Sequence, residues 1–155
     1  MSDLPLIYLE PTKDKREIIK ILSDPRIYRE CYGIPYYPKA RVHIGFQNYY
    51  IKYKQHILGL FQLDKFVSHA VIFHGCVLPK FRKPNLLVAI ADACKDNLRK
   101  YSEFNKIVTT VPSNANHVLK FLNKVDFKEE ARIKDCFQYN SEIADCILMT
   151  FNLRE

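Results

Sequence analysis

The sequence lacks a long apolar segment, since no window approaches a run of about 18 uninterrupted apolar residues. A membrane-spanning helix is therefore not expected. Residues 1–5, MSDLP, contain neither the basic region nor the apolar region of a secretory signal peptide. These two absences predict an intracellular, cytoplasmic protein with no membrane partner.

The sequence also lacks any CxxC pair. Its five cysteines are odd in number and widely spaced, which argues against a disulfide framework. We expect them to be small core residues in a reducing compartment. The histidines show no metal-ligand spacing, so no metal site is predicted. They stand at positions 43, 56, 69, 74 and 117.

No helix-turn-helix, zinc or single-strand-binding module is recognisable, although the formal net charge is +7. Residues 1–128 hold 21 basic and 11 acidic side chains, and such a field attracts phosphates or acidic surfaces without selecting among them. The aromatic residues of segment 48–54, NYYIKYK, alternate at strand period, which explains them as well as base stacking does. Specific nucleic-acid recognition is not expected.

The 155 residues are enough to bury a core without a cofactor or disulfide, and we expect a single domain spanning residues 1–155. Apolar periodicity and turn residues predict a mixed α+β pattern. The expected strands are 6–9, 49–53, 57–63, 67–77 and 106–111, with a final hairpin of 127–133 and 147–153. The expected helices are 11–22, 25–31, 86–101 and one that begins at Asn114 or Asn116 and runs to Lys124. Residues 32–41 are expected to form a surface loop, and residues 64–65 a turn.

Residues 66–100 combine an apolar strand, a basic turn with proline and a long amphipathic helix. This order usually marks an anion-binding loop, because the first amides of a helix have no partner within it. We expect the amides of Asn85, Leu86 and Leu87 to be free. The turn adds positive charge from Lys80, Arg82 and Lys83. A phosphate-bearing ligand would fit there, and the alternative is a solvated basic turn before a structural helix.

Three further segments follow one another along the chain: HGCVLPKFRKPNLL (74–87), VPSNANHVLKFLNKVDF (111–127) and SEIADCILMTFNLRE (141–155). In this order they resemble the GCN5-related N-acetyltransferase (GNAT) superfamily, and the resemblance spans nearly the whole chain. The resemblance implies a mostly antiparallel mixed sheet with helices on both faces. It also implies that the central strands, 67–77 and 106–111, run parallel and splay apart. The implied cofactor is acetyl-coenzyme A.

The resemblance also implies positions for the site. The implied cofactor-binding residues are Cys76, Val77, Leu78, Arg82, Lys83, Asn85, Leu86, Leu87 and Asn116. His74 lies near the end of a strand where the family places its acceptor cleft, and the ordinary pKa of histidine suits a base near neutral pH. His74 is therefore the candidate catalytic residue, although a histidine packed in the sheet and bonded to a neighbour would look the same. Asp64 and Tyr139 are further residues that could reach this cleft.

The chain departs from the family pattern at the cofactor loop and at the acid position. Asn85 and Leu87 stand where the family has small residues, and Pro84 removes one donor amide. Leu122 stands where many members have a tyrosine that protonates the departing thiolate. Two hypotheses therefore remain open. One is an acetyltransferase acting on an amine, such as a protein amino terminus, a lysine or a small amine. The other is a catalytically silent binding or assembly module, similar to small bacteriophage-encoded head-assembly proteins. The sequence does not predict an oligomeric state.

Overall fold

The computed structural model describes residues 5–32, 42–101 and 103–154. Its elements follow in the order β1 (Ile7–Pro11), α1 (Lys15–Leu22), α2 (Pro25–Tyr32), β2 (Gln47–Tyr53), β3 (His56–Val67), β4 (Ala70–Val77), a 3₁₀ turn η1 (Pro79–Phe81), α3 (Pro84–Arg99), β5 (Lys106–Pro112), α4 (Asn116–Lys124), β6 (Lys128–Tyr139) and β7 (Glu142–Asn152). In these residues no helix is both long and apolar enough to cross a membrane.

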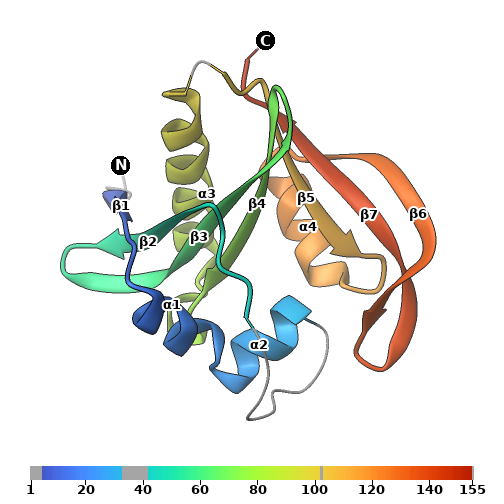
Figure 1. Cartoon of the computed structure of the whole chain (residues 1–155), viewed down its shortest axis with the longest axis horizontal. Coiled ribbons are helices and arrows are strands. Elements are labelled where there is room, and N and C mark those ends of the chain that lie inside the picture. The colour runs from blue at the N-terminus through green and yellow to red at the C-terminus, as the bar shows by residue number, and fades with distance from the viewer. Residues whose placement is uncertain (1–4, 33–41, 102, 155) are drawn as a thin grey trace.

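One sheet contains the seven strands in the order β1-β2-β3-β4-β5-β7-β6. All neighbours are antiparallel except β4 and β5, which the crossover helix α3 joins in parallel. The parallel ladder covers only residues 70–72 and 106–108, and beyond it the two strands diverge (Figure 1). The predicted mixed sheet with a splayed parallel central pair is therefore confirmed.

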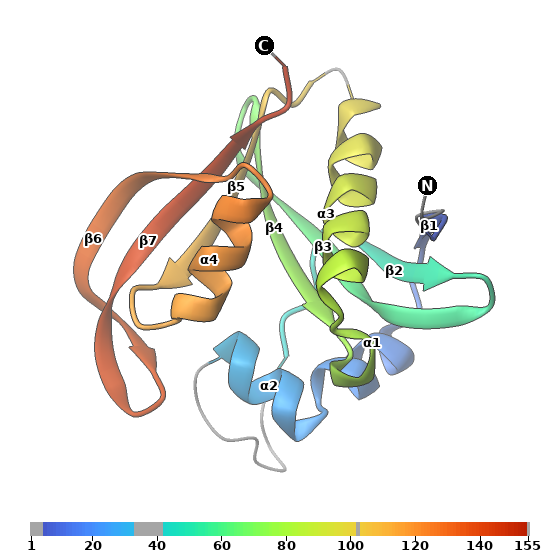
Figure 2. The same ribbon diagram turned by 180° about the vertical axis from the view of Figure 1, so that it is seen from behind.

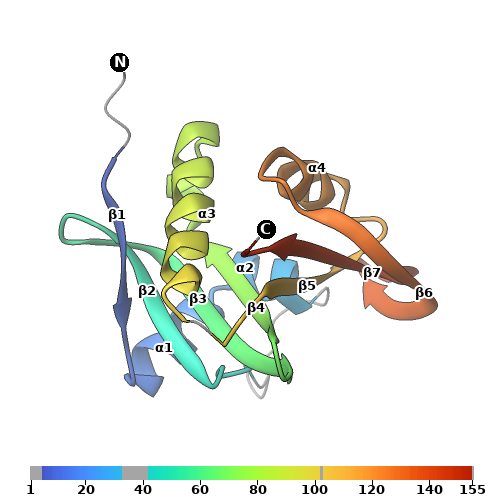
Figure 3. The same cartoon turned by 90° about the horizontal axis from the view of Figure 1, so that it is seen from above.

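Helices cover both faces of the sheet, as predicted. α3 and α4 lie on one face and α1 and α2 on the other (Figures 2 and 3). Neighbouring residues of β3 are consequently both buried, with Phe61 in the cluster that contains Leu98 of α3 and Leu60 in the cluster that contains Ile18 of α1. Because a strand points alternate side chains to opposite faces, β3 connects the two cores.

Several predicted boundaries were wrong. β3 continues through residues 64–65 to Val67, and the turn falls at Ser68 and His69. The charged side chains suggested a turn, but Asp64 pairs with Ile72 in the β3–β4 ladder. The last hairpin is longer than predicted and turns at Asn140 and Ser141, both with positive φ, as a two-residue hairpin turn requires. Residues 33–41 of the predicted loop lie outside the described residues.

The cysteines do not all belong to the core, which corrects the prediction. All five are free; Cys146 is buried, Cys76 and Cys94 are half-buried, and Cys31 and Cys136 are exposed. Cys31 is exposed because it lies on the short helix α2, of which Ile27 and Tyr28 form the buried face.

Candidate functional site

The divergence of β4 and β5 leaves the second half of β4 without a partner on one side. The Leu78 amide donates to the Leu58 carbonyl of β3 at 2.8 Å, so the Leu78 amide is already committed to the β3 side. Since successive residues direct their backbone groups to opposite sides of a strand, those of Gly75 and Val77 face the gap toward β5. The backbone N–H and C=O groups of Cys76, like the Leu78 amide, point toward β3. The sequence had not singled out Gly75.

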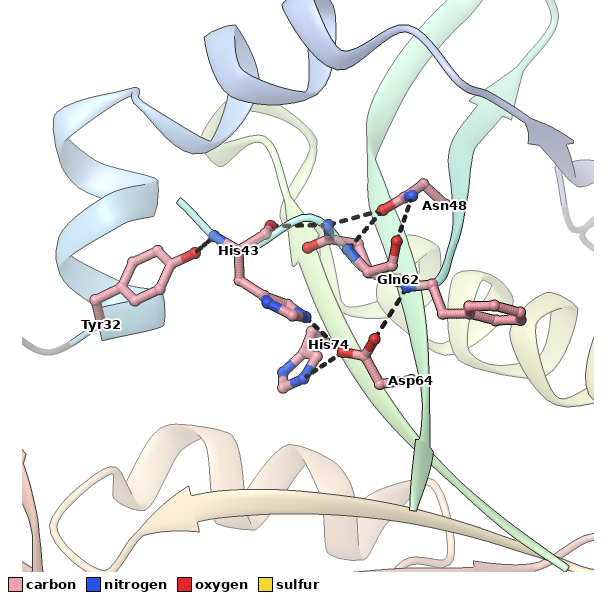
Figure 4. A network of polar contacts seen from close by, with 8 residues as sticks. Tyr32, His43, Asn48, Gln62, Asp64 and His74 are labelled. Atoms are coloured by element: carbon pink, nitrogen blue, oxygen red, sulfur yellow. Dashed lines mark hydrogen bonds and ion pairs between the residues drawn. The ribbon is translucent and has the colours of Figure 1, made fainter. Parts of the chain in front are cut away.

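A cluster of His43, Asp64 and His74 lies beside this gap. His74 lies two residues beyond the last parallel pair of β4, and Asp64 lies on the neighbouring strand β3. The Asp64 Oδ2 atom is 2.5 Å from His43 Nε2 and 3.6 Å from His74 Nε2. The two imidazoles converge on that one carboxylate oxygen (Figure 4). Asp64 and His74 were predicted to share a cleft, whereas His43 had been considered only among the histidines without metal-ligand spacing.

A set of backbone hydrogen bonds holds this cluster in place (Figure 4). The His43 amide donates to the Tyr32 hydroxyl of α2 at 2.6 Å, and the buried Gln62 side chain donates to the His43 carbonyl at 3.1 Å. The Phe46 amide donates to Asp64 Oδ1 at 2.9 Å. One carboxylate oxygen is thus fixed by the backbone, which directs the other oxygen at the two imidazoles.

The electrostatics of the cluster favour a neutral His74 beside an ionised Asp64. Burial and the charge of His43 lower the pKa of His74, and the opposing charge of Asp64 does not compensate. Burial acts to raise the pKa of Asp64, but hydrogen bonds from His43 and the Phe46 amide outweigh it, so the pKa falls below its usual range. A neutral imidazole next to a carboxylate has the protonation state of a general base.

Arg82 of the basic turn contacts α2 rather than pointing to solvent. Its Nε donates to the Val77 carbonyl at 2.8 Å, and its Nη1 donates to Glu30 Oε1 at 2.7 Å. Nη2 lies 2.5 Å from the other carboxylate oxygen of Glu30, so the ion pair is bidentate. Arg82 therefore ties the turn to α2. Glu30 gave no signal in the sequence, because it is 52 positions away.

The start of α3 offers fewer free amides than expected. The Leu87 amide donates to the Lys83 carbonyl at 2.9 Å, so the expectation that it is free was wrong. Pro84 has no amide hydrogen, and the first-turn donors that remain are Asn85 and Leu86. A surface hollow beside this helix start is lined by Asp24, Arg26, Leu78, Pro79 and Lys80.

The thiols of Cys31 and Cys76 join α2 to the end of β4. Their mutual hydrogen bond raises the pKa of Cys31 and lowers that of Cys76. Tyr139 is buried at the end of β6, and burial together with the nearby charge of Glu30 raises its pKa. Tyr139 therefore lies near α2, which contains Glu30.

The remaining predicted residues lie on α4 or just before it. This helix begins at Asn116, which is exposed, and not at Asn114, whose side chain donates to the Tyr139 carbonyl at 3.2 Å. Leu122 is buried in the core beneath α4. No proton donor is therefore available at the position of Leu122.

No protein-family model matches the sequence, and no curated protein matches it. Solved structures do match the fold. The spermidine N-acetyltransferase from Vibrio cholerae, crystallised with CoA and spermine, has a TM-score of 0.77 over 95% of both chains at 14% identity. A protein of Streptococcus mutans has a TM-score of 0.73 at 18% identity, covering 94% of this chain and 99% of its own. A GNAT-family acetyltransferase from Bacillus anthracis has a TM-score of 0.60 at 16% identity, covering 70% and 67%. This chain therefore has the fold of the GNAT acetyltransferases.

Proposed function

We propose that this protein is an N-acyltransferase that transfers the acetyl group of acetyl-coenzyme A to an amine. The observation that carries the proposal is the position of His74, which lies beside Asp64 where β4 separates from β5. An extended ligand in that gap would meet the backbone groups of Gly75 and the amide of Val77, while the Val77 carbonyl accepts from Arg82 Nε. The fold that this chain shares with CoA-binding acetyltransferases supports the same reading.

Acetyl-coenzyme A would supply the acetyl thioester. The Asn85 and Leu86 amides, together with Lys80 and Lys83, are the groups that would hold its phosphates, since helix amides and positive charge favour anions. The Cys76–Leu78 segment, through the Val77 amide above all, would hold its extended portion. Asn116, the first residue of α4, is the further residue that the family resemblance assigns to the cofactor.

His74 would act on the acceptor. Its neutral imidazole takes a proton from the acceptor ammonium, directly or through water, so that the amine nitrogen gains a free electron pair. Asp64 then faces the imidazolium that forms and stabilises its positive charge at 3.6 Å. The negative charge of Asp64 also favours a cationic acceptor near His74.

The acceptor in this proposal is an amine, either a small one or the amino group of a protein. Spermine, bound in the Vibrio cholerae structure, is one small amine to test. The proposal keeps the cytoplasmic location expected from the sequence, because the reaction requires a compartment that contains acetyl-coenzyme A.

The test is a calorimetric titration of the full chain with acetyl-coenzyme A and with coenzyme A, followed by an acetylation assay on a panel of amines. We expect binding of both and acetyl transfer to at least one amine. Replacing Arg82 by Ala tests whether this residue leaves Glu30 to bind the cofactor. If Arg82 turns to the phosphates on binding, the affinity falls by about 1–3 kcal/mol. An absence of cofactor binding to the parent protein would reject the enzyme.

A second function, a catalytically silent binding module of the same fold, is favoured by one observation. The Arg82 charge is already neutralised by Glu30, in a loop where Pro84 and Asn85 also depart from the family pattern. A protein partner would then replace the cofactor. The narrower hypothesis of a bacteriophage head-assembly protein has no support among the structures named above, which are bacterial. The same titration distinguishes the silent module from the enzyme, because a silent module binds no acetyl-coenzyme A.

A further inference from the structure

We propose that His43, Asp64 and His74 form a binding site for a zinc ion. The ligand atoms of the three side chains all lie within 4.8 Å of one another. Two imidazole nitrogens and one carboxylate oxygen are a ligand set that zinc uses at open sites, where water occupies the fourth position. The sequence did not predict this site, because its ligands are 21 and 10 positions apart and come from a connecting segment and two strands.

The spacing of the cluster is close to what a zinc ion requires. Two tetrahedral zinc ligands with bonds of about 2.0–2.2 Å are separated by about 3.3–3.6 Å. His74 Nε2 and Asp64 Oδ2 are already 3.6 Å apart. His43 Nε2 and Asp64 Oδ2 are 2.5 Å apart, so this pair must open by about 1 Å. The proton that they share would move to Nδ1 of the imidazole or to solvent.

The surroundings of the three ligands support metal binding. Metal ligands are usually oriented by further hydrogen bonds, and here the Phe46 amide fixes Asp64 Oδ1 so that Oδ2 faces both imidazoles. The backbone of His43 is held at both its amide, by Tyr32, and its carbonyl, by Gln62. His43 and His74 are each about half exposed, which gives an ion access from solvent.

The donor atoms indicate the class of metal. Imidazole nitrogen suits zinc and its transition-metal neighbours, whereas magnesium and calcium prefer sites made of oxygen atoms. The Cys31 and Cys76 thiols are a competing zinc ligand pair in this part of the protein. The experiment must therefore distinguish nitrogen and oxygen ligands from sulfur ligands.

Zinc at this site would inhibit the acetyl transfer proposed above, since the metal would occupy the electron pair with which His74 accepts a proton. This consequence rests on the proposed function, but zinc binding itself does not. A protein that binds zinc here and transfers no acetyl group even after chelation has removed the zinc would reject the enzyme and keep the metal site.

The experiment is a titration of the full chain, first freed of metal by chelation, with Zn²⁺ by calorimetry and with Co²⁺ by visible absorption. We expect one equivalent of each metal, and d–d bands of Co²⁺ without a thiolate charge-transfer band. His43→Ala, Asp64→Asn and His74→Ala should each weaken zinc binding at least about tenfold. His56→Ala is the matched control, because His56 is an exposed histidine at the first residue of β3, outside the cluster. It should bind zinc as the parent does.

Three results would overturn the proposal. They are a parent that binds no zinc with a Kd below about 1 mM, a Co²⁺ spectrum with thiolate bands, and cluster variants that bind zinc as tightly as His56→Ala. Circular dichroism and thermal unfolding check that each variant is folded. If one variant unfolds, the other two variants and the Co²⁺ spectrum of the parent still show whether the cluster binds the metal.

Discussion

The guanidinium of Arg82 forms a bidentate ion pair with the carboxylate of Glu30, with Nη1 2.7 Å from Oε1 and Nη2 2.5 Å from Oε2. This contact joins the basic turn after β4 to helix α2, and it uses the positive charge that the turn would otherwise offer to a phosphate. Hydrogen bonding to Glu30 also raises the pKa of Arg82. If the proposed acetyl-coenzyme A binds at this turn, it would compete with Glu30 for Arg82.

Glu30→Gln should consequently strengthen binding of acetyl-coenzyme A. Both side chains are partly exposed, so the pair is worth about 0.2–1 kcal/mol, and its loss should tighten binding by roughly 1.5- to 5-fold. Calorimetric titration measures the change. Glu10→Gln, which breaks the exposed pair with Lys52 at 3.1 Å, is the control and should leave the affinity unchanged. Weaker binding by Glu30→Gln would instead mean that the ion pair shapes the turn for the cofactor.

Asn85→Gly should also strengthen cofactor binding, by several-fold, because removing the side chain lets a phosphate approach the helix amides more closely. Asn85 is exposed at the second position of α3, so the cost in stability is at most about 1 kcal/mol. The measurement is the thermal shift produced by acetyl-coenzyme A. Asp92→Gly, at an exposed position later in α3, reports the cost of a glycine together with the loss of the Asp92–Lys95 pair at 4.0 Å, away from the cofactor turn. Equal cofactor-induced shifts in the two variants would contradict the prediction.

His74→Gln should reduce kcat/KM for acetyl transfer by about 10²- to 10⁴-fold, since glutamine cannot accept the proton. The affinity for acetyl-coenzyme A should stay the same, because the proposed mechanism places His74 at the acceptor. Steady-state kinetics and calorimetry separate the two effects. His56→Gln should retain full activity. A loss of cofactor affinity in His74→Gln would place His74 in the cofactor site instead.

The value of kcat/KM for acetyl transfer should fall at low pH. The midpoint of this fall should lie below the ordinary pKa of a histidine. Burial lowers the pKa of His74 from its usual value of about 6.5, so the base stays neutral until the pH drops below that value. Because the charge of Asp64 acts to raise this pKa, Asp64→Asn should move the acid limb to a still lower pH. Profiles of kcat/KM in the presence of a chelator test both points. An acid limb above about pH 6.5 would contradict the assignment of His74.

Gly59→Ala should destabilise the sheet at its centre. A Cβ atom at Gly59 would collide with the Cys76 carbonyl oxygen of the paired strand β4, and overpacking of this kind costs about 1–3 kcal/mol or more. Gly75→Ala is the matched control on β4, where the nearest atom would be the Phe73 ring at 3.5 Å, an ordinary contact. Denaturant unfolding measures both free energies. Equal values would show that β3 and β4 can separate without loss of stability.

The order of strands and helices was predictable because it depends on local patterns. Apolar spacing placed α3, and the strand–helix–strand sequence of residues 67–111 required a parallel crossover connection. The boundary at residues 64–65 was wrong because Asp64 looks like a turn residue, while its actual partners, His43 and the Phe46 amide, are 21 and 18 positions away.

By itself the sequence determined the architecture of this protein, the basic turn and the candidacy of His74, since each depends on residues that are neighbours in the chain. Only the tertiary structure decided what those residues contact. It brought His43 to Asp64 and Glu30 to Arg82, and it committed the Leu78 amide to β3. A charged or polar side chain pairs with whichever partner the folded backbone brings within hydrogen-bonding distance. No periodicity in the sequence encodes that partner.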